Sequence, residues 1–355
     1  MKKTLLLSVV ASTMIMAGGD IAPVEPVVEA PVEVASWNFS GQAVAYTQTR
    51  DSLGGTQGGD LFGGNTTAGG LGLQLRATND DIFAGIGFGA EVTTIQDGVS
   101  ANYSNTHFGM QDGSALTQAY LTYGMDSIST SFKIGRQTLP KSLSPFAFSE
   151  GWGMFKNTFD AALVVKSSLP NTTTVYAFVT RGNGTVTPLP GSALHPWAAI
   201  QGGYEDLADF DKIYDDGVHL LTLQNKSFDN LTLTGTWYYG PNHTEWLLGS
   251  GYGDTNVLWG DATYKADAFT IGVQGGTIDP DGIDKTTGYG VKIAGKLGMF
   301  NLSAAYTSVD DGTVKMANFG TSVKTPLYTQ SILDQDTISL DSDTFKIAAS
   351  TKVLG

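Results

Sequence analysis

The sequence contains no cysteine and few charged residues. Among 355 residues, Cys is absent, and Asp, Glu, Lys and Arg together make up 15%. The absence of cysteine excludes thiol catalysis, disulfide bonds and cysteine-ligated metals. No run of about 18 apolar residues follows the N-terminal region, so no transmembrane helix is predicted. The net charge of −14 argues against nucleic acid as a partner.

Catalytic motifs are also missing. The chain has four histidines, and it carries no nucleophile elbow, HExxH motif, P-loop or dinucleotide-binding glycine motif. His219, near the start of an expected strand, is the one weak candidate for a hydrolytic base. The sequence therefore predicts a protein that is not an enzyme.

Two N-terminal segments precede the bulk of the chain. Residues 1–17 have the pattern of a secretory signal peptide, in which Lys2 and Lys3 precede an uncharged, largely apolar stretch and a cleavage site after Ala17. Residues 18–36 are rich in Pro, Glu and Val, which favours an extended periplasmic linker. The remaining residues, 37–355, are expected to form one domain.

Apolar and polar residues alternate in segments of about ten residues from Trp37 onward. In one segment, Leu71 and Leu73 fall on one face, and Gln74 and Arg76 fall on the other. Strands that cross a membrane need about 9–11 residues, with lipid-facing and lumen-facing positions in alternation. We count about fourteen such strands, and the 45 glycines fit many tight turns.

The connections between the predicted strands alternate between short turns and long polar loops. Short turns are expected at residues 79–81, 125–127, 170–171, 228–230, 266–268 and 298–299. Long loops are expected at about 48–70, 96–114, 138–159, 181–216, 241–255, 277–287 and 310–342. This pattern is typical of an all-β, up-and-down antiparallel transmembrane barrel. Aromatic residues near strand ends fit its interfacial girdles: Tyr123, Trp237, Tyr239, Tyr264 and Tyr306.

The third long loop, Thr138–Phe159, differs from the others in composition. It carries only three charged residues, Lys141, Glu150 and Lys156, among several aromatic residues. Apolar side chains of this kind need a surface to pack on, and two prolines stiffen the segment. We expect the loop to fold into the barrel and constrict it, with the three charged residues at the constriction. Packing over the rim or in a subunit interface is the alternative.

The charged residues on the predicted strands are mostly basic, whereas most acidic residues lie in loops. Those expected to line the lumen are Arg76, Glu91, Lys133, Lys166, Asp261, Lys265, Lys292 and Lys296. An acidic mouth would concentrate cations, and a basic wall would guide anions. These two features oppose each other, so the sequence leaves ion selectivity open, with the acidic mouth favouring cations.

Acidic side chains gather in two loops that could bind Ca²⁺. Asp279, Asp281 and Asp284 form one run, and Asp310 and Asp311 form the other. Oxygen ligands suit this cation, but the bidentate glutamate of an EF-hand loop is missing. Solvated surface loops are the simpler interpretation, and no other cofactor is predicted.

Residues Thr117–Val165 resemble the core of the major outer-membrane porins of epsilon-class proteobacteria, which are similar to OprD-like channels. The likeness rests mainly on Gly135–Gln137 before the third loop and Asn157–Asp160 after it. Residues 325–330 and 341–345 also look like late-loop motifs of that family. The resemblance implies a trimeric barrel of about 16–18 strands. It also implies passive diffusion of ions and small hydrophilic solutes, with the third loop as the constriction.

The expected location is the outer membrane, with lipid and lipopolysaccharide around the barrel. The alternative function is a surface-exposed structural or adhesive barrel with acidic ligand-binding loops. Barrels of this kind usually end on an aromatic residue, whereas this sequence ends on Gly355. Because about fourteen strands are visible where the resemblance implies about 16–18, we expect a C-terminally truncated copy.

Overall fold

The computed structural model describes residues 36–49, 67–97, 113–151, 154–183, 207–213, 216–241, 253–320, 324–330 and 338–352. The predicted signal peptide and, apart from Ser36, the predicted linker lie outside these ranges. Within them the secondary structure is almost entirely β-strand, with one 3-10 turn, η1 (Asp126–Ile128). No helix in the described ranges has the length and apolar content needed to cross a bilayer.

All strands in the described ranges belong to one antiparallel sheet. They are β1 (Asn38–Thr49), β2 (Thr67–Phe83), β3 (Ile86–Asp97), β4 (Gly113–Met125), β5 (Thr130–Gln137), β6 (Phe159–Leu169), β7 (Thr172–Gly182), β8 (Asp211–Lys212), β9 (Val218–Phe228), β10 (Leu231–Gly240), β11 (Thr255–Lys265), β12 (Phe269–Pro280), β13 (Thr286–Leu297), β14 (Phe300–Val309) and β15 (Ser342–Thr351). Except for the short β8, which pairs with β7, each strand pairs with the next in chain order. This path of fourteen strands confirms the predicted up-and-down architecture.

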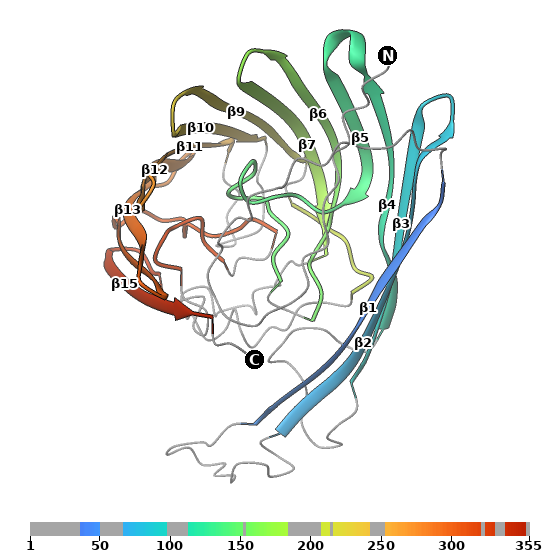
Figure 1. The fold of residues 1–355 in the computed structure, drawn as a ribbon, viewed down its shortest axis with the longest axis horizontal. Helices are drawn as coiled ribbons and strands as arrows, with labels where there is room; N and C mark the ends of the chain where they lie inside the picture. Colours follow the sequence, from blue (N-terminus) through green and yellow to red (C-terminus); the bar gives the residue numbers. More distant parts are fainter. Residues whose placement is uncertain are drawn as a thin grey trace.

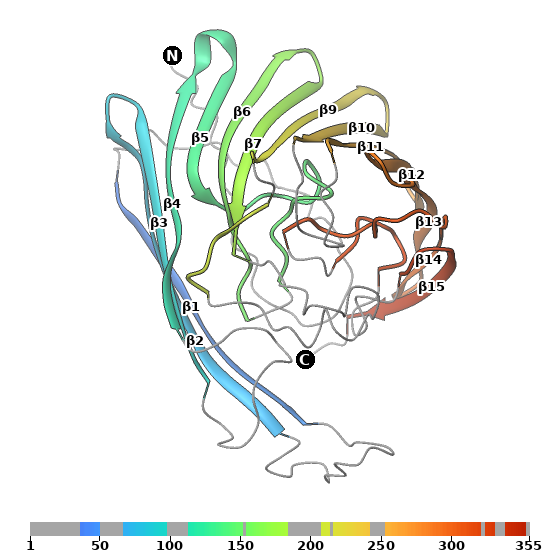
Figure 2. The same ribbon diagram turned by 180° about the vertical axis from the view of Figure 1, so that it is seen from behind.

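The sheet curls around a central space that contains loop segments (Figures 1 and 2). We call this space the lumen. β1 and β15 are the two terminal strands of the path. Short turns and long connections alternate along the described strands, as the sequence predicted.

The first short turn lies later than predicted. β2 continues to Phe83, and the turn consists of Ala84 and Gly85, whose φ angles are +50° and +83°. Asn79 accepts a hydrogen bond from the Asp81 N–H, and Asp81 accepts one from the Gly85 N–H, both at 2.9 Å. These local bonds accompany an irregular register between Asn79 and Phe83. The polar run that suggested a turn, residues 79–81, is therefore part of the final segment of β2.

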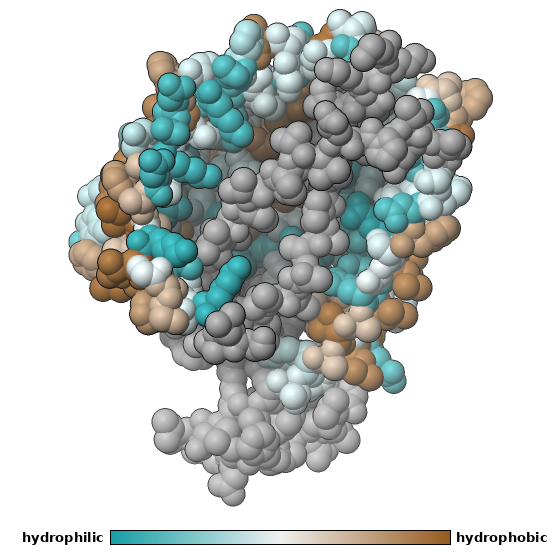
Figure 3. All heavy atoms as spheres, in the orientation of Figure 1, coloured by the Kyte–Doolittle hydropathy of each residue, from teal (hydrophilic) through white to brown (hydrophobic). Residues whose placement is uncertain are grey.

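The two faces of the sheet carry different side chains. Exposed apolar residues alternate along the outward face, as Leu73 and Leu75 do on β2 and Val291 and Ile293 on β13. Apolar residues accordingly lie along the outer edges of the molecule in Figure 3. An apolar outer face alternating with a mixed inner face is the pattern of a lipid-facing barrel wall.

The main hydrophobic core lies inside the curve of the sheet rather than between two layers. Strand residues such as Tyr238 and Trp259 contribute to it from the wall, and Phe146, Met316 and Leu327 contribute from two loops. The core therefore fixes loop segments against the inner wall.

Candidate functional site

The third loop, residues 138–158, leaves β5 and packs first against β10 and β11. Phe146 is fully buried, and its backbone N–H donates a hydrogen bond to the Tyr238 hydroxyl at 2.9 Å. Its ring meets Tyr238 and Trp259 edge to face, with centroids 6.0 and 5.3 Å away. Burial of an aromatic ring with a satisfied backbone N–H holds this half of the loop inside the lumen.

The other half of the third loop packs against β2, β3 and β4. Phe155 is buried in a second core cluster with Ile95 and Ala115. Gly72 makes this approach possible, because a Cβ atom there would lie 2.5 Å from the Phe155 ring. β2–β4 lie across the curve from β10 and β11 (Figure 1). The third loop thus crosses the lumen from one wall to the other.

A second loop also folds inward. Residues 310–341, the last loop, connect β14 to β15 and were predicted to be a long polar external loop. Instead, Met316, Ala317 and Leu327 are buried at 2%, 5% and 1% exposure. Phe319 stacks on Phe146, with ring centroids 5.5 Å apart, and its N–H donates to the Phe146 carbonyl at 2.7 Å. The last loop therefore supports the third loop from the side of β12–β15.

Side-chain contacts reinforce this loop–loop pairing. Asn318 accepts a hydrogen bond from the Phe148 N–H and donates one to the Phe148 carbonyl. Lys141 donates from Nζ to the Thr325 carbonyl at 3.1 Å. The Lys141 side chain, predicted to lie at the constriction, is therefore part of the loop–loop interface.

Tyr328 attaches the last loop to the wall. Its hydroxyl donates to Asp261 on β11, and the Lys292 Nζ lies 4.3 Å above its ring. Asp261 also accepts a hydrogen bond from the Thr263 hydroxyl at 3.0 Å. A Cβ atom on Gly272 would lie 2.6 Å from the Tyr328 hydroxyl oxygen, so the glycine makes room for the contact. Asp261 and Lys292, both predicted to line the lumen, therefore face this loop.

Glu150 is the buried acid of the third loop. It is 4% exposed; its Oε1 accepts a hydrogen bond from Asn318, and its Oε2 has no hydrogen-bond partner. Burial raises the pKa of Glu150 to about 7, and the positive charges of Lys324 and Lys141 oppose the rise. The third charged residue of the loop, Lys156, is exposed. The three predicted constriction residues thus occupy three different environments.

A basic cluster with one acid lines the wall of β2–β5. The Arg76 guanidinium donates to the Tyr120 hydroxyl at 2.7 Å, and the Lys133 Nζ lies 3.8 Å above the Tyr120 ring. Glu91 is paired with Arg76 in the β2–β3 register and accepts a hydrogen bond from Thr117 at 3.0 Å. One carboxylate between two cations leaves this wall with a net positive charge.

The remaining predicted lumen residues lie near strand ends. Lys265 shares a face with Asp261, and Lys296 shares a face with Lys292, by alternation along β11 and β13; both lysines are exposed. Lys166 differs: it follows Val165, which is paired with the buried Val175, so it lies on the outward face of β6. Lys346 on β15 faces the lumen, since its neighbours Phe345 and Ile347 are exposed on the outward face, and its Nζ donates to the Gln330 carbonyl at 2.9 Å.

No protein-family model and no curated protein matches the sequence. The solved structures to which the chain is similar include three proteins of Pseudomonas aeruginosa. For OpdO the identity is 11%, the TM-score 0.61, and the match covers 88% of this chain and 73% of that chain. For OpdG the identity is 13% and the TM-score 0.62, and the match covers 89% of this chain and 77% of that chain. For the outer membrane protein OpdK the identity is 12% and the TM-score 0.61, with 88% of this chain and 76% of that chain covered. The chain has the fold of OprD-like porins.

That fold agrees with the expected likeness to OprD-like channels and with the antiparallel barrel predicted from the sequence. At this level of identity the likeness concerns the fold. The comparisons do not support the closer resemblance to the porins of epsilon-class proteobacteria.

The candidate calcium residues do not form a cluster. Asp279, Asp281 and Asp284 are all exposed. In the described part of the chain, no group of three or more Asp, Glu or His side chains is arranged to hold a metal ion. His219 lies on the outward face of β9, where its Nδ1 is 2.8 Å from the Tyr176 hydroxyl. That position among aromatic rings fits an interfacial residue.

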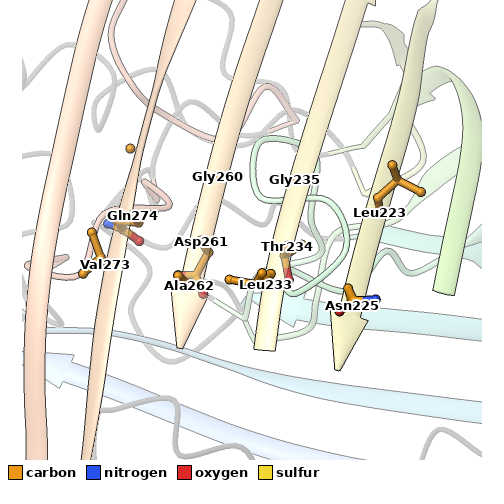
Figure 4. A pocket seen from close by; sticks show the side chains of 11 residues that line it. Leu223, Asn225, Leu233, Thr234, Gly235, Gly260, Asp261, Ala262, Val273 and Gln274 are labelled. Carbon is orange, nitrogen blue, oxygen red and sulfur yellow. The ribbon is translucent and has the colours of Figure 1, made fainter. Parts of the chain in front are cut away.

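A shallow pocket lies on the wall formed by β9–β12 (Figure 4). Gly235, Gly260 and Gly275 are aligned in register across three strands. A Cβ atom on Gly235 would contact nothing within 4 Å. The pocket is bounded by Leu223 and Val273, which are each 50% exposed, so it opens on the outward face of the wall.

Sequence reasoning missed Asn318, Tyr328 and Tyr120 as residues that shape the lumen. Each is a neutral polar side chain, and charge was the criterion for choosing lumen residues. The buried apolar residues Met316 and Leu327 could have indicated the inward fold of the last loop, since a freely solvated loop does not bury such side chains.

Proposed function

We propose that the protein is an outer-membrane channel for the passive diffusion of ions and small hydrophilic solutes. The observation that carries this proposal is the third loop, which crosses a lumen with polar and charged walls between Phe146 and Phe155. The fold it shares with outer membrane proteins such as OpdK supports the same location and role. A pore narrowed by an inward loop sorts solutes by size and charge and needs no catalytic residue.

The proposed constriction has two parts. The third loop supplies the crossing segment, and the last loop supplies the Tyr328 attachment beside Asp261 and Lys292. Since the hydrogen bonds of Asn318 and Lys141 join the loops, we propose that they act as one unit.

The charge of the described lumen wall favours anions. Glu91 and Asp261 each accept hydrogen bonds from neutral side chains, and the basic groups Arg76, Lys133 and Lys292 outnumber them. Of the six acidic residues of the fourth loop that suggested an acidic mouth, Asp209, Asp211 and Asp216 are described, and residues 205, 206 and 215 lie outside the described residues. OpdK has been crystallised with vanillate. We propose that small organic anions are among the solutes.

In the outer membrane, the barrel would contact lipid and assemble with other copies of the chain. The outward apolar face would contact outer-membrane lipid, with lipopolysaccharide in the outer leaflet. The segment from Thr117 to Val165 supports a relationship to the major porins of epsilon-class proteobacteria, and homotrimer assembly follows from that resemblance. Native gel migration of the refolded protein with and without crosslinking tests the trimer.

Planar-bilayer recording tests the channel. Refolded full-length protein is expected to give discrete ion-current steps, and deletion of residues 145–153 is expected to raise the single-channel conductance. Ser142→Ala, an exposed change in the same loop, serves as the control and should leave the conductance unchanged. Absence of current from correctly folded protein would reject the channel and favour the surface adhesin.

A further inference from the structure

Four ionisable side chains lie in one row across β5–β8, on the side of the sheet where the long loops emerge. Arg136 is paired in register with Asp160, Asp160 with Arg181, and Arg181 with Lys212. The Asp160 carboxylate accepts from the Arg136 Nε at 2.9 Å and from the Arg181 Nη2 at 2.8 Å. The row contains three cations and one anion.

This row faces away from the lumen. Phe159 and Ala161, on either side of Asp160 along β6, are buried in the main core, so the Asp160 side chain lies on the opposite face. Ile134, two residues before Arg136 on β5, is 57% exposed on the outward face. The register places Arg181 and Lys212 on the same outward face as Asp160.

Aromatic side chains mark the depth of the row. Phe178 is paired with His219, and His219 with Tyr239, on the outward face just below the row. Trp237 stacks on Tyr239, with ring centroids 6.1 Å apart. Such rings gather at the boundary between hydrocarbon and head groups. Arg181, beyond Phe178 toward the loop end, therefore lies at head-group depth.

Within the row, Arg181 and Lys212 are the groups available to a ligand. Arg136 has three partners of its own: it is paired with Asp160, it donates to the Leu116 carbonyl at 2.9 Å, and its guanidinium stacks on the Phe210 ring before β8. The Arg181 side chain is 51% exposed, with one guanidinium nitrogen bound to Asp160, and Lys212 is exposed beside it.

We propose that Arg181 and Lys212, with Arg181 oriented by Asp160, bind a phosphate group of a phosphorylated glycolipid in the outer leaflet. A guanidinium and an ammonium side by side suit a phosphate dianion, because Arg offers a planar fork of donors and Lys a compact charge. The site rests on the outer-membrane location in the proposed function, and it adds a defined lipid contact outside the pore.

Native mass spectrometry of the refolded full-length protein tests the site. The probes are lipid A carrying both phosphates, the same lipid with both phosphates removed, and inorganic phosphate. Wild-type protein is expected to retain the phosphorylated lipid and not the dephosphorylated one. The double variant Arg181→Gln/Lys212→Gln removes both contacts and should lower the retained fraction by at least about tenfold, since the loss of one charge-assisted contact already corresponds to about tenfold. Asp160→Asn should lower it less, because it loosens Arg181 without removing it.

The matched control is Lys166→Gln/Lys226→Gln, which removes two exposed positive charges near the short turns. The proposal is overturned if this control loses lipid to the same extent, if the dephosphorylated lipid is retained equally, or if millimolar inorganic phosphate displaces the lipid. Conductance of the same wild-type preparation distinguishes failure of the lipid site from failure of the proposed outer-membrane location. A conducting protein that retains no lipid overturns the lipid site alone, and a protein that neither conducts nor retains lipid overturns the outer-membrane assignment.

Discussion

The Asn318 side-chain amide binds both backbone groups of Phe148. Its Nδ2 donates to the Phe148 carbonyl at 2.7 Å, and its Oδ1 accepts from the Phe148 N–H at 3.2 Å. The two residues are 170 positions apart in the chain, and both are buried. The last loop thus completes the hydrogen bonding of the third loop as a neighbouring strand would, at the point where the third loop crosses the lumen.

Removing this amide should loosen the constriction. Asn318→Ala leaves the N–H and the carbonyl of Phe148 buried without their partner, at a cost of roughly 2–4 kcal/mol. We expect larger fluctuations of single-channel current and faster protease cleavage within residues 138–158. Asn301→Ala, an exposed asparagine on β14, is the control. Equal current noise in both variants would show that the last loop does not support the third.

Glu150 should make the packing of the third loop dependent on pH. Its folded-state pKa of about 7 lies above the ordinary value of 4.5 because the carboxyl is buried. Between these values the folded chain binds more protons than the unfolded chain, so stability falls as pH rises. The full contribution is present below about pH 4.5 and is lost as pH passes about 7. Urea unfolding of vesicle-refolded protein at a series of pH values measures it.

The comparison variant for this effect is Glu150→Gln, which cannot ionise. Its free energy of unfolding should exceed that of the wild type by up to about 3 kcal/mol at pH 8, and the difference should shrink toward pH 5. Asp267→Asn, an exposed change in the turn between β11 and β12, should follow the wild type. Parallel pH curves for the Gln variant and the wild type would contradict the prediction.

The charge on the β2–β5 wall should influence ion selectivity. Lys133→Gln removes a cation that faces the lumen beside Arg76 and Tyr120. The permeability ratio of K⁺ to Cl⁻ should rise, and the reversal potential in a KCl gradient should move toward that of K⁺. The reversal potential should be measured at low salt, because at 0.1 M salt the electrostatic effect of a wall charge is screened beyond about 10 Å. Lys166→Gln removes the same charge from the outward face and should change nothing.

The strands could be predicted from the sequence because their pattern is local. Alternating side chains such as Leu73 and Gln74 report directly which face is outward. Charge alone is a poorer guide to the face of a side chain, and Lys166 is the example. It alternates with Val165, whose partner Val175 is buried, so it faces outward although it is charged. A long basic side chain near a strand end can extend its charged group toward water, so charge does not by itself mark the lumen.

The third loop could be predicted to fold inward, because its aromatic residues are dense and need a wall. The last loop carries a weaker signal of the same kind in Met316 and Leu327, but its pairing with the third loop could not be predicted, because the residues that join the two loops are far apart in the sequence. Tyr328 bonds to a residue 67 positions away, and Asn318 to one 170 positions away. Contacts between residues so far apart produce no periodic pattern in the sequence, so only the three-dimensional structure reveals that the two loops pair.

Gly272 should be required for the attachment of the last loop to the wall. A methyl group at this position would lie 2.6 Å from the Tyr328 hydroxyl oxygen and 3.0 Å from the adjacent ring carbon. Gly272→Ala must displace the Tyr328 ring, and overpacking of this kind costs about 1–3 kcal/mol. We expect faster protease cleavage within residues 310–341 and an altered single-channel conductance.

The matched control for this change lies on a nearby strand. A Cβ atom on Gly235 of β10 would meet nothing within 4 Å, so Gly235→Ala adds the same methyl group without a clash. Tyr328→Phe tests the contact from the other side, since it removes the hydrogen bond to Asp261 and keeps the ring. If Tyr328 attaches the loop, Gly272→Ala and Tyr328→Phe should both speed cleavage and Gly235→Ala should not. Slow cleavage in all three variants would place the attachment elsewhere, at the contacts of Asn318 and Phe319 with the third loop.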